Sequence, residues 1–86
     1  MDELIIDEHA LMHGLAADDI EYAWYNFVAK MHRGAPKEGE IIAVGYDGKG
    51  RFLEMVGAER PFATIVFHAI SPPTRNAMRE LGMEKG

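Results

Sequence analysis

Apolar residues follow a helical period in the first part of the chain and a strand period after it. Positions 20, 23, 24, 27, 28 and 31 obey the spacing i, i+3, i+4, i+7, i+8, i+11, which places them on one face of a helix. Asp18 and Glu21 form a D-x-x-E pattern that is typical of a helix start. We therefore predict a helix that begins at residues 16–18 and ends at Met31.

A short strand and a short helix are predicted before this long helix. The stretch ELIID at residues 3–7 is typical of a strand. Asp7 can then cap a helix that runs from Glu8 to Met12 or His13, and Gly14 is expected to end it.

Beyond Met31 the pattern changes to that of strands. Residues 32–40, HRGAPKEGE, predict a polar loop that is long enough to carry function. The apolar run FATIVFHAI is apolar on both faces, which places it centrally in a sheet. We predict three strands and two turns: strands at 41–46, 51–57 and 62–70, and turns at 47–50 and 58–61.

The last element is predicted to be a helix. Ser71 can cap it with Pro72 at its first position, and it runs to about Leu81 and stops at Gly82. The resulting order, β-α-α-β-β-β-α, predicts the α+β class: an antiparallel sheet with helices covering one face. We expect a single domain over residues 1–86.

Composition narrows the class of protein. The chain has no cysteine, which excludes a disulfide framework and a thiolate metal site. No apolar run approaches the roughly 18 residues typical of a membrane span. The acidic N-terminal stretch MDELIIDEH does not resemble a secretory signal, so we expect a soluble, cytoplasmic protein that does not bind membranes.

Charge is distributed unevenly along a chain whose net charge is −5. Residues 1–27 contain seven acidic residues and no Lys or Arg, whereas residues 28–86 contain nine basic and seven acidic residues, a net charge of +2. This balance argues against broad nucleic-acid binding but allows a local basic site. It also allows one acidic face that suits a basic partner.

Two histidines four residues apart, His9 and His13, would share one face of a helix. HALMH has no Glu after its first His, so it is not the zinc-protease signature, and a metal site needs further ligands. No spacing unites the pair with His32 or His68. We therefore expect no metal and no cofactor, with metal binding by His9 and His13 as the weaker alternative.

A second group of residues could bind a phosphodiester. Arg75 and Arg79 share one face of the last predicted helix, Arg51 opens the middle strand, and His68 lies just before that helix. Arginines stabilise developing negative charge and a histidine transfers a proton. Solvated arginines and a core histidine are the alternative. Glu54 either faces water or pairs with a cross-strand arginine.

Three stretches resemble BrnT-type toxins, which belong to the RelE-like toxins of bacterial type II toxin–antitoxin pairs. They are HALMHGLAADDIEYAW, EIIAVGYDGKGRFLEMV and IVFHAISPPTRNAMREL, within residues 5–81. The resemblance implies a RelE/BrnT-like fold, a metal-independent endoribonuclease and a cognate antitoxin as partner. A homodimer is also compatible with the sequence.

The resemblance also implies site residues. His13 falls on the family's K-H-G histidine, Arg51 on the arginine after the Gly-rich turn, and Arg75 and Arg79 on the helix arginines. In the implied reaction the ribose 2′-hydroxyl attacks the adjacent phosphate, with His13 or His68 transferring the proton and the three arginines holding the phosphate. Met12 stands where the family has a lysine, and ISPP replaces an arginine. The alternative is therefore a catalytically inactive protein-interaction module of the same fold.

Overall fold

The computed structural model describes residues 3–84, which form a small α+β domain around one five-stranded sheet. None of the helices in this part of the chain is long and apolar enough to span a membrane. The elements, in chain order, are β1 (Glu3–Ile6), the 3₁₀ helix η1 (Glu8–Leu11), α1 (Ala17–Tyr25), β2 (Phe27–His32), β3 (Glu40–Tyr46), β4 (Phe52–Glu59), β5 (Ala63–Ile70) and α2 (Arg75–Glu80).

The sheet is mixed, with the strand order β1-β5-β4-β3-β2. Strands β2 to β5 form an antiparallel meander, as predicted for the last three of them. β1 instead pairs in parallel with β5, so the prediction of a purely antiparallel sheet is wrong. The segment from η1 to α1 carries the chain from the β1 edge to the β2 edge, and this crossover makes the parallel pairing possible.

The predicted long helix is wrong beyond Tyr25. Asn26 leaves the helical conformation, with φ −109° and ψ 42°, and its side chain donates a hydrogen bond to the Tyr22 carbonyl over 2.9 Å. Phe27–His32 then forms an antiparallel edge strand beside β3. The order is therefore β-η-α-β-β-β-β-α. Phe27, Val28 and Met31 had fitted the helical spacing, yet in the strand they are 48%, 51% and 42% exposed.

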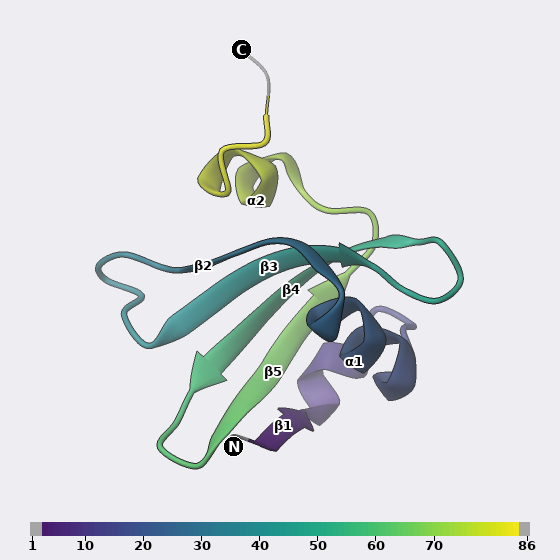
Figure 1. Ribbon diagram of the computed structural model, residues 1–86, viewed down its shortest axis with the longest axis horizontal. Helices are drawn as coiled ribbons and strands as arrows, with labels where there is room; N and C mark the ends of the chain where they lie inside the picture. The colour runs from purple at the N-terminus through teal and green to yellow at the C-terminus, as the bar shows by residue number, and fades with distance from the viewer. Residues whose placement is uncertain (1–2, 85–86) are drawn as a thin grey trace.

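Helices lie on both sides of the sheet, so the prediction that they cover one face is wrong (Figure 1). Side chains alternate along β3 and β4: Ala43 packs toward α1, whereas Ile42 packs toward α2. The core on the α1 side consists of Ala10, Leu15, Ile20, Ala23, Trp24, Ile41, Ala43, Leu53, Met55, Val66 and Ala69. The cluster on the α2 side consists of Ile42, Val56 and Ala77, with Phe67 and Leu81 packed against it.

Several local predictions are confirmed. Asp7 caps η1 by accepting a hydrogen bond from the His9 amide over 3.1 Å. Gly14 and Gly82 follow their helices with φ of +82° and +71°, which only glycine adopts at little cost. The chain also turns between β3 and β4, at residues 47–50, as predicted.

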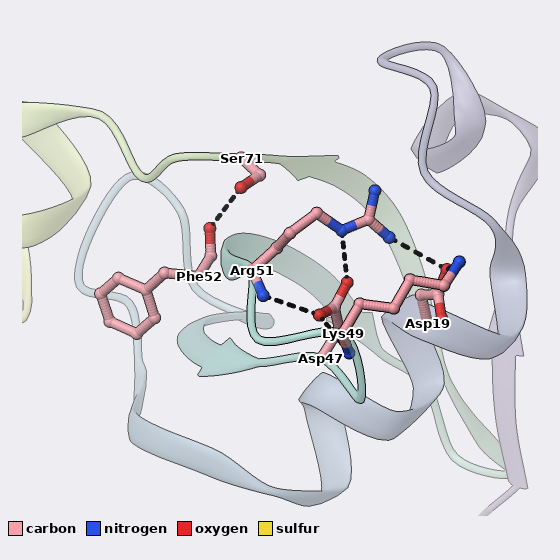
Figure 2. A network of polar contacts seen from close by, with 6 residues as sticks. All are labelled: Asp19, Asp47, Lys49, Arg51, Phe52 and Ser71. Atoms are coloured by element: carbon pink, nitrogen blue, oxygen red, sulfur yellow. Dashed lines mark hydrogen bonds and ion pairs between the residues drawn. The ribbon is translucent and has the colours of Figure 1, made fainter.

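The last helix starts later than predicted. Thr74, not Ser71, is its N-cap, because the Thr74 hydroxyl accepts a hydrogen bond from the Ala77 amide over 3.2 Å. The Ser71 hydroxyl donates instead to the Phe52 carbonyl over 2.7 Å, which fixes the segment between β5 and α2 (Figure 2). The turn between β4 and β5 is also displaced, since β4 continues to Glu59.

Candidate functional site

A pocket of about 520 Å³ lies on the α2 side of the sheet. Its floor is apolar and includes Ile42, Val56 and Phe67, and its wall is polar. The polar groups come from five parts of the chain: His13 from the turn after η1, Arg33 and Lys37 from the loop between β2 and β3, Glu54 from β4, His68 from β5, and Thr74 and Glu80 from α2 and its cap.

A β-bulge aims His68 into this pocket. Val56 pairs with His68 and Gly57 pairs with Val66, so Phe67 is an extra residue in β5. The extra residue lets Phe67 and His68 both line the pocket, while Val66 and Ala69 on either side remain in the core under α1. The bulge therefore converts a central, largely apolar strand into one that presents an imidazole.

His68, Glu54 and Thr74 form a continuous hydrogen-bonded chain. The His68 Nε2 and Glu54 Oε2 atoms are 2.8 Å apart. The other carboxylate oxygen of Glu54 accepts hydrogen bonds from the amide and the hydroxyl of Thr74, each over 2.8 Å. The Glu54 side chain is only 9% exposed, so these donors replace the water that a carboxylate would otherwise bind.

These contacts keep Glu54 ionised. Its burial by itself would raise the pKa, but the hydrogen bonds from Thr74 and from His68 outweigh burial and hold the pKa of Glu54 below its ordinary value. An ionised Glu54 accepts a hydrogen bond from the Nε2–H of His68, which leaves Nδ1 as the ring nitrogen that can accept a proton. The pair thus has the geometry of a carboxylate-oriented imidazole.

His13 lies beside His68, although the two are far apart in sequence. Their ring centroids are 6.0 Å apart and their planes are at 80°, an edge-to-face contact. The contact arises because η1 packs against β5 and the following turn carries His13 to the pocket. Two imidazoles, one of them held by a carboxylate, are therefore adjacent.

His9 also lines the pocket, but its side chain has a different environment from that of His13. Its Nδ1 is 3.0 Å from Asp7 Oδ2, and its side chain is 78% exposed. Within residues 3–84, no three His, Asp or Glu side chains are arranged to hold a metal ion.

Arg33 closes one side of the pocket through three ion-pair contacts. Its Nε and Nη2 atoms donate to the two carboxylate oxygens of Glu80 over 2.8 and 2.9 Å, and its Nη1 donates to Glu40 over 3.0 Å. The hydrogen bonds to Glu80 raise the pKa of a guanidinium whose side chain is only 14% exposed. Arg33 therefore joins α2 to the start of β3.

The carboxylates of the pocket are all engaged, and so is the guanidinium of Arg33. Glu54 is held by His68 and Thr74, and Glu40 and Glu80 by Arg33. Lys37, by contrast, makes no side-chain ion pair or hydrogen bond with any residue in the range 3–84. A ligand in the pocket meets Lys37 and three imidazoles, a set that suits an anion such as a phosphate.

Arg51 does not reach the pocket. Its guanidinium donates to Asp47 over 2.7 Å and to Asp19 over 3.0 Å, and Lys49 joins the same Asp19 carboxylate over 3.0 Å (Figure 2). The Asp47 carboxylate also accepts hydrogen bonds from the backbone amides of Lys49 and Arg51. This network joins the β3–β4 turn to α1. The contacts of Arg51 therefore hold two parts of the fold together.

Arg75 and Arg79 lie on the outward side of α2. Their side chains are 85% and 63% exposed, and both approach the same Glu84 oxygen, at 3.5 and 3.4 Å. Neither residue lines the pocket. Of the five residues that the sequence suggested, the structure brings His13 and His68 together and places the three arginines elsewhere.

Sequence reasoning missed Arg33, Lys37 and the role of Thr74. The only signal for the first two was the polar 32–40 loop, and for Thr74 its place at the end of a Ser-Pro-Pro-Thr run. The chain matches no family model, and neither a curated protein nor a solved structure matches it.

Proposed function

We propose that this protein is a metal-independent endoribonuclease of the RelE/BrnT-like type, the toxin of a bacterial type II toxin–antitoxin pair. The observation that carries the proposal is the contact between His13 and His68, with His68 held by Glu54, in a pocket whose free polar groups suit a phosphate. RNA supplies its own nucleophile, the 2′-hydroxyl, so two proton-transfer groups and a cation can suffice.

In the proposed reaction, one imidazole takes the proton of the ribose 2′-hydroxyl as its oxygen attacks the adjacent phosphorus. The bond from phosphorus to the 5′-oxygen breaks, and the other imidazole donates a proton to that leaving oxygen. The products are a 2′,3′-cyclic phosphate and a 5′-hydroxyl. His68 suits the base, because Glu54 holds its Nε2 and stabilises the imidazolium that forms. His13 is then the acid.

Lys37 takes the phosphate-binding role that the sequence had suggested for the three arginines. It lies on the wall of the same pocket and has no carboxylate partner in the described part of the chain. Arg33 acts indirectly, since its single positive charge offsets part of the negative charge of Glu40 and Glu80, which would otherwise repel a phosphate more strongly. The proposal includes two further points: the protein acts in the cytoplasm, and a cognate antitoxin binds it and inhibits it.

A specific observation favours the alternative of an inactive interaction module. Arg33 and Arg51, the two arginines with partly buried contacts, are both occupied by carboxylates, and the chain has a net charge of −5. Such a chain attracts RNA weakly, because affinity for RNA comes largely from contacts between cations and phosphates.

The test is cleavage of single-stranded RNA by purified protein in the presence of EDTA. We expect products that end in a 2′,3′-cyclic phosphate, and a loss of rate of about 100-fold or more in His68→Ala and in His13→Ala. Lys37→Ala should raise KM more than it lowers kcat. Arg60→Ala is the matched control, because Arg60 is an exposed cation outside the pocket.

Two results would count against the proposal. Intact RNA after incubation with the wild-type protein, together with unimpaired bacterial growth when the protein is expressed, would favour the interaction module. Cleavage that EDTA abolishes would instead indicate a metal-dependent reaction.

A further inference from the structure

Helix α1 presents an exposed stripe that is half acidic and half aromatic. Residues 18, 21, 22 and 25 follow the spacing i, i+3, i+4, i+7, so they lie together on the side of the helix opposite to buried Ile20, Ala23 and Trp24. Tyr22 and Tyr25 are 51% and 61% exposed.

The aromatic part of this stripe continues into the edge of the sheet. Phe27 and Val28, which follow α1 directly, are about half exposed, at 48% and 51%. The pairing of β2 with β3 shifts between Phe27 and Ala29, so Val28 bulges from the edge strand. Tyr22, Tyr25, Phe27 and Val28 together are called the α1–β2 surface.

The charge next to the α1–β2 surface is negative and unpaired. Asp18 and Glu21 are exposed and make no ion pair with any residue between 3 and 84. Asp19, the remaining acid of the helix, is neutralised by Lys49 and Arg51. The nearby Lys30 is partly buried and lies over two aromatic rings, with its Nζ 4.2 Å from the centre of the Trp24 ring and 4.4 Å from that of Phe27.

We propose that the α1–β2 surface binds a cationic, extended segment of a partner protein, in which Lys or Arg alternates with apolar residues. Aromatic side chains with two or three rotatable bonds give contact area at low entropic cost, as in many protein interfaces. The partner's cations meet Asp18 and Glu21, and its apolar side chains cover Tyr22, Tyr25 and Val28. Edge strand β2 also offers unpaired backbone groups to an extended segment.

Other occupants fit this surface less well. The phosphates of RNA would be repelled by Asp18 and Glu21, which form no ion pair with any residue between 3 and 84. A second copy that docks through the same surface would bring a second pair of these acids into the contact, where they repel the first. The surface also lies on the α1 side, whereas the catalytic pocket lies on the α2 side, so the inference does not depend on RNA cleavage.

The test uses the full-length protein and a fluorescein-labelled peptide of alternating lysine and valine, with a glutamate–valine peptide as its counterpart. We expect saturable binding of the lysine peptide only, measured by fluorescence anisotropy. Tyr25→Ala should weaken the binding of the lysine peptide roughly tenfold, and Glu21→Gln should weaken it roughly fivefold. Higher salt should weaken it further, because charge contributes to the contact.

Two matched variants separate this surface from the general acidity of the chain. Phe62→Ala removes an 86% exposed aromatic ring at the β4–β5 turn, and Glu38→Gln removes an exposed acid from the β2–β3 loop. Both should bind the lysine peptide like the wild type. Equal weakening in test and control variants would overturn the proposal, and so would displacement of the peptide by single-stranded RNA or a homodimer that Tyr25→Ala dissociates.

Discussion

The two sides of the sheet are held to their helices by different kinds of interaction. On the α1 side, Ile20, Ala23 and Trp24 pack against buried strand residues, and ion pairs from Arg51 and Lys49 to Asp19 join α1 to the sheet only at the β3–β4 turn. On the α2 side, the apolar cluster is small, and hydrogen bonds and ion pairs complete the attachment. Figure 1 shows the two helices on opposite sides of the sheet.

Because of this difference, the α1 side contributes mainly to the stability of the fold, whereas the α2 side holds the candidate reactive groups. A close-packed apolar interface contributes most of the free energy of folding and leaves no space for a ligand. The α2 side retains a pocket of about 520 Å³ because polar contacts, rather than side chains filling the space, hold the helix there. The groups that could react, His13 and His68, are on this side.

The largest effect is expected from Gly45→Ala, on the α1 side. A β-carbon at Gly45 would clash with the carbonyl oxygen of Ala23 and approach the Cα of Phe27, so backbone must shift. We expect a loss of about 3 kcal/mol in the free energy of unfolding and a fall in Tm of at least about 10 °C. Urea and thermal unfolding measure both quantities.

Gly48→Ala is the control for this substitution, since nothing lies within 4 Å of a β-carbon there. It should change stability by less than about 0.5 kcal/mol. If the two variants were equally stable, close packing of α1 on β3 would not be what limits the stability of that side.

A smaller and more local effect is expected from Arg33→Ala, on the α2 side. The substitution leaves the partly buried carboxylates of Glu40 and Glu80 without their cation. Because these groups keep some contact with water, we expect a loss of about 2 kcal/mol, below the range for fully buried pairs. Hydrogen exchange should become faster in α2 while the amides of α1 keep their protection.

The exposed Arg79 provides the comparison for Arg33. Its side chain is 63% exposed and its contact with Glu84 is 3.4 Å long, so Arg79→Ala should cost less than about 0.5 kcal/mol. Faster exchange throughout α1 in Arg33→Ala would show that the two sides are not independent.

The same contrast explains which parts of the fold could be predicted from the sequence. Strands β3 and β5, the 47–50 turn and the Gly82 stop depend on local signals, and all were predicted. The segment 27–31 was misassigned because its apolar positions fit both a helical stripe and an edge strand. Its pairing with β3 decided between them.

The arrangement of the candidate site could be predicted only in part, because it depends on register and on packing. A hairpin centred on the predicted 58–61 turn would place His68 opposite Arg51. The observed register places His68 opposite Val56, and therefore diagonal to Glu54. The position of His13 beside His68 and that of Arg33 beside Glu80 are tertiary contacts that no local pattern indicates.

Thr74→Val tests how far the α2 side depends on a single hydroxyl. The Thr74 hydroxyl both caps α2 and donates to Glu54. We expect a loss of about 1 kcal/mol from the missing cap, which lowers Tm by about 5 °C. Thr74→Ser keeps the hydroxyl and should restore most of the stability. A valine variant as stable as the serine variant would show that the hydroxyl contributes little.

The smallest expected effect is the acid sensitivity that Glu54 gives to the α2 side. Its folded-state pKa lies below the ordinary value of 4.5, because the hydrogen bonds from Thr74 and His68 outweigh burial. The stability that it contributes is therefore fully present above about pH 4.5 and is lost as the pH falls through the lower folded-state pKa. Glu54→Gln should lack this loss.

Asp47, whose pKa is also lowered because the hydrogen bonds from Lys49 and Arg51 outweigh its burial, keeps the α1 side acid-sensitive in both proteins. Protection factors for α2 and for the 47–50 turn, measured from neutral pH to about pH 3, separate the two contributions. An equal loss of α2 protection in the wild type and in Glu54→Gln would assign the acid sensitivity of that side to another group.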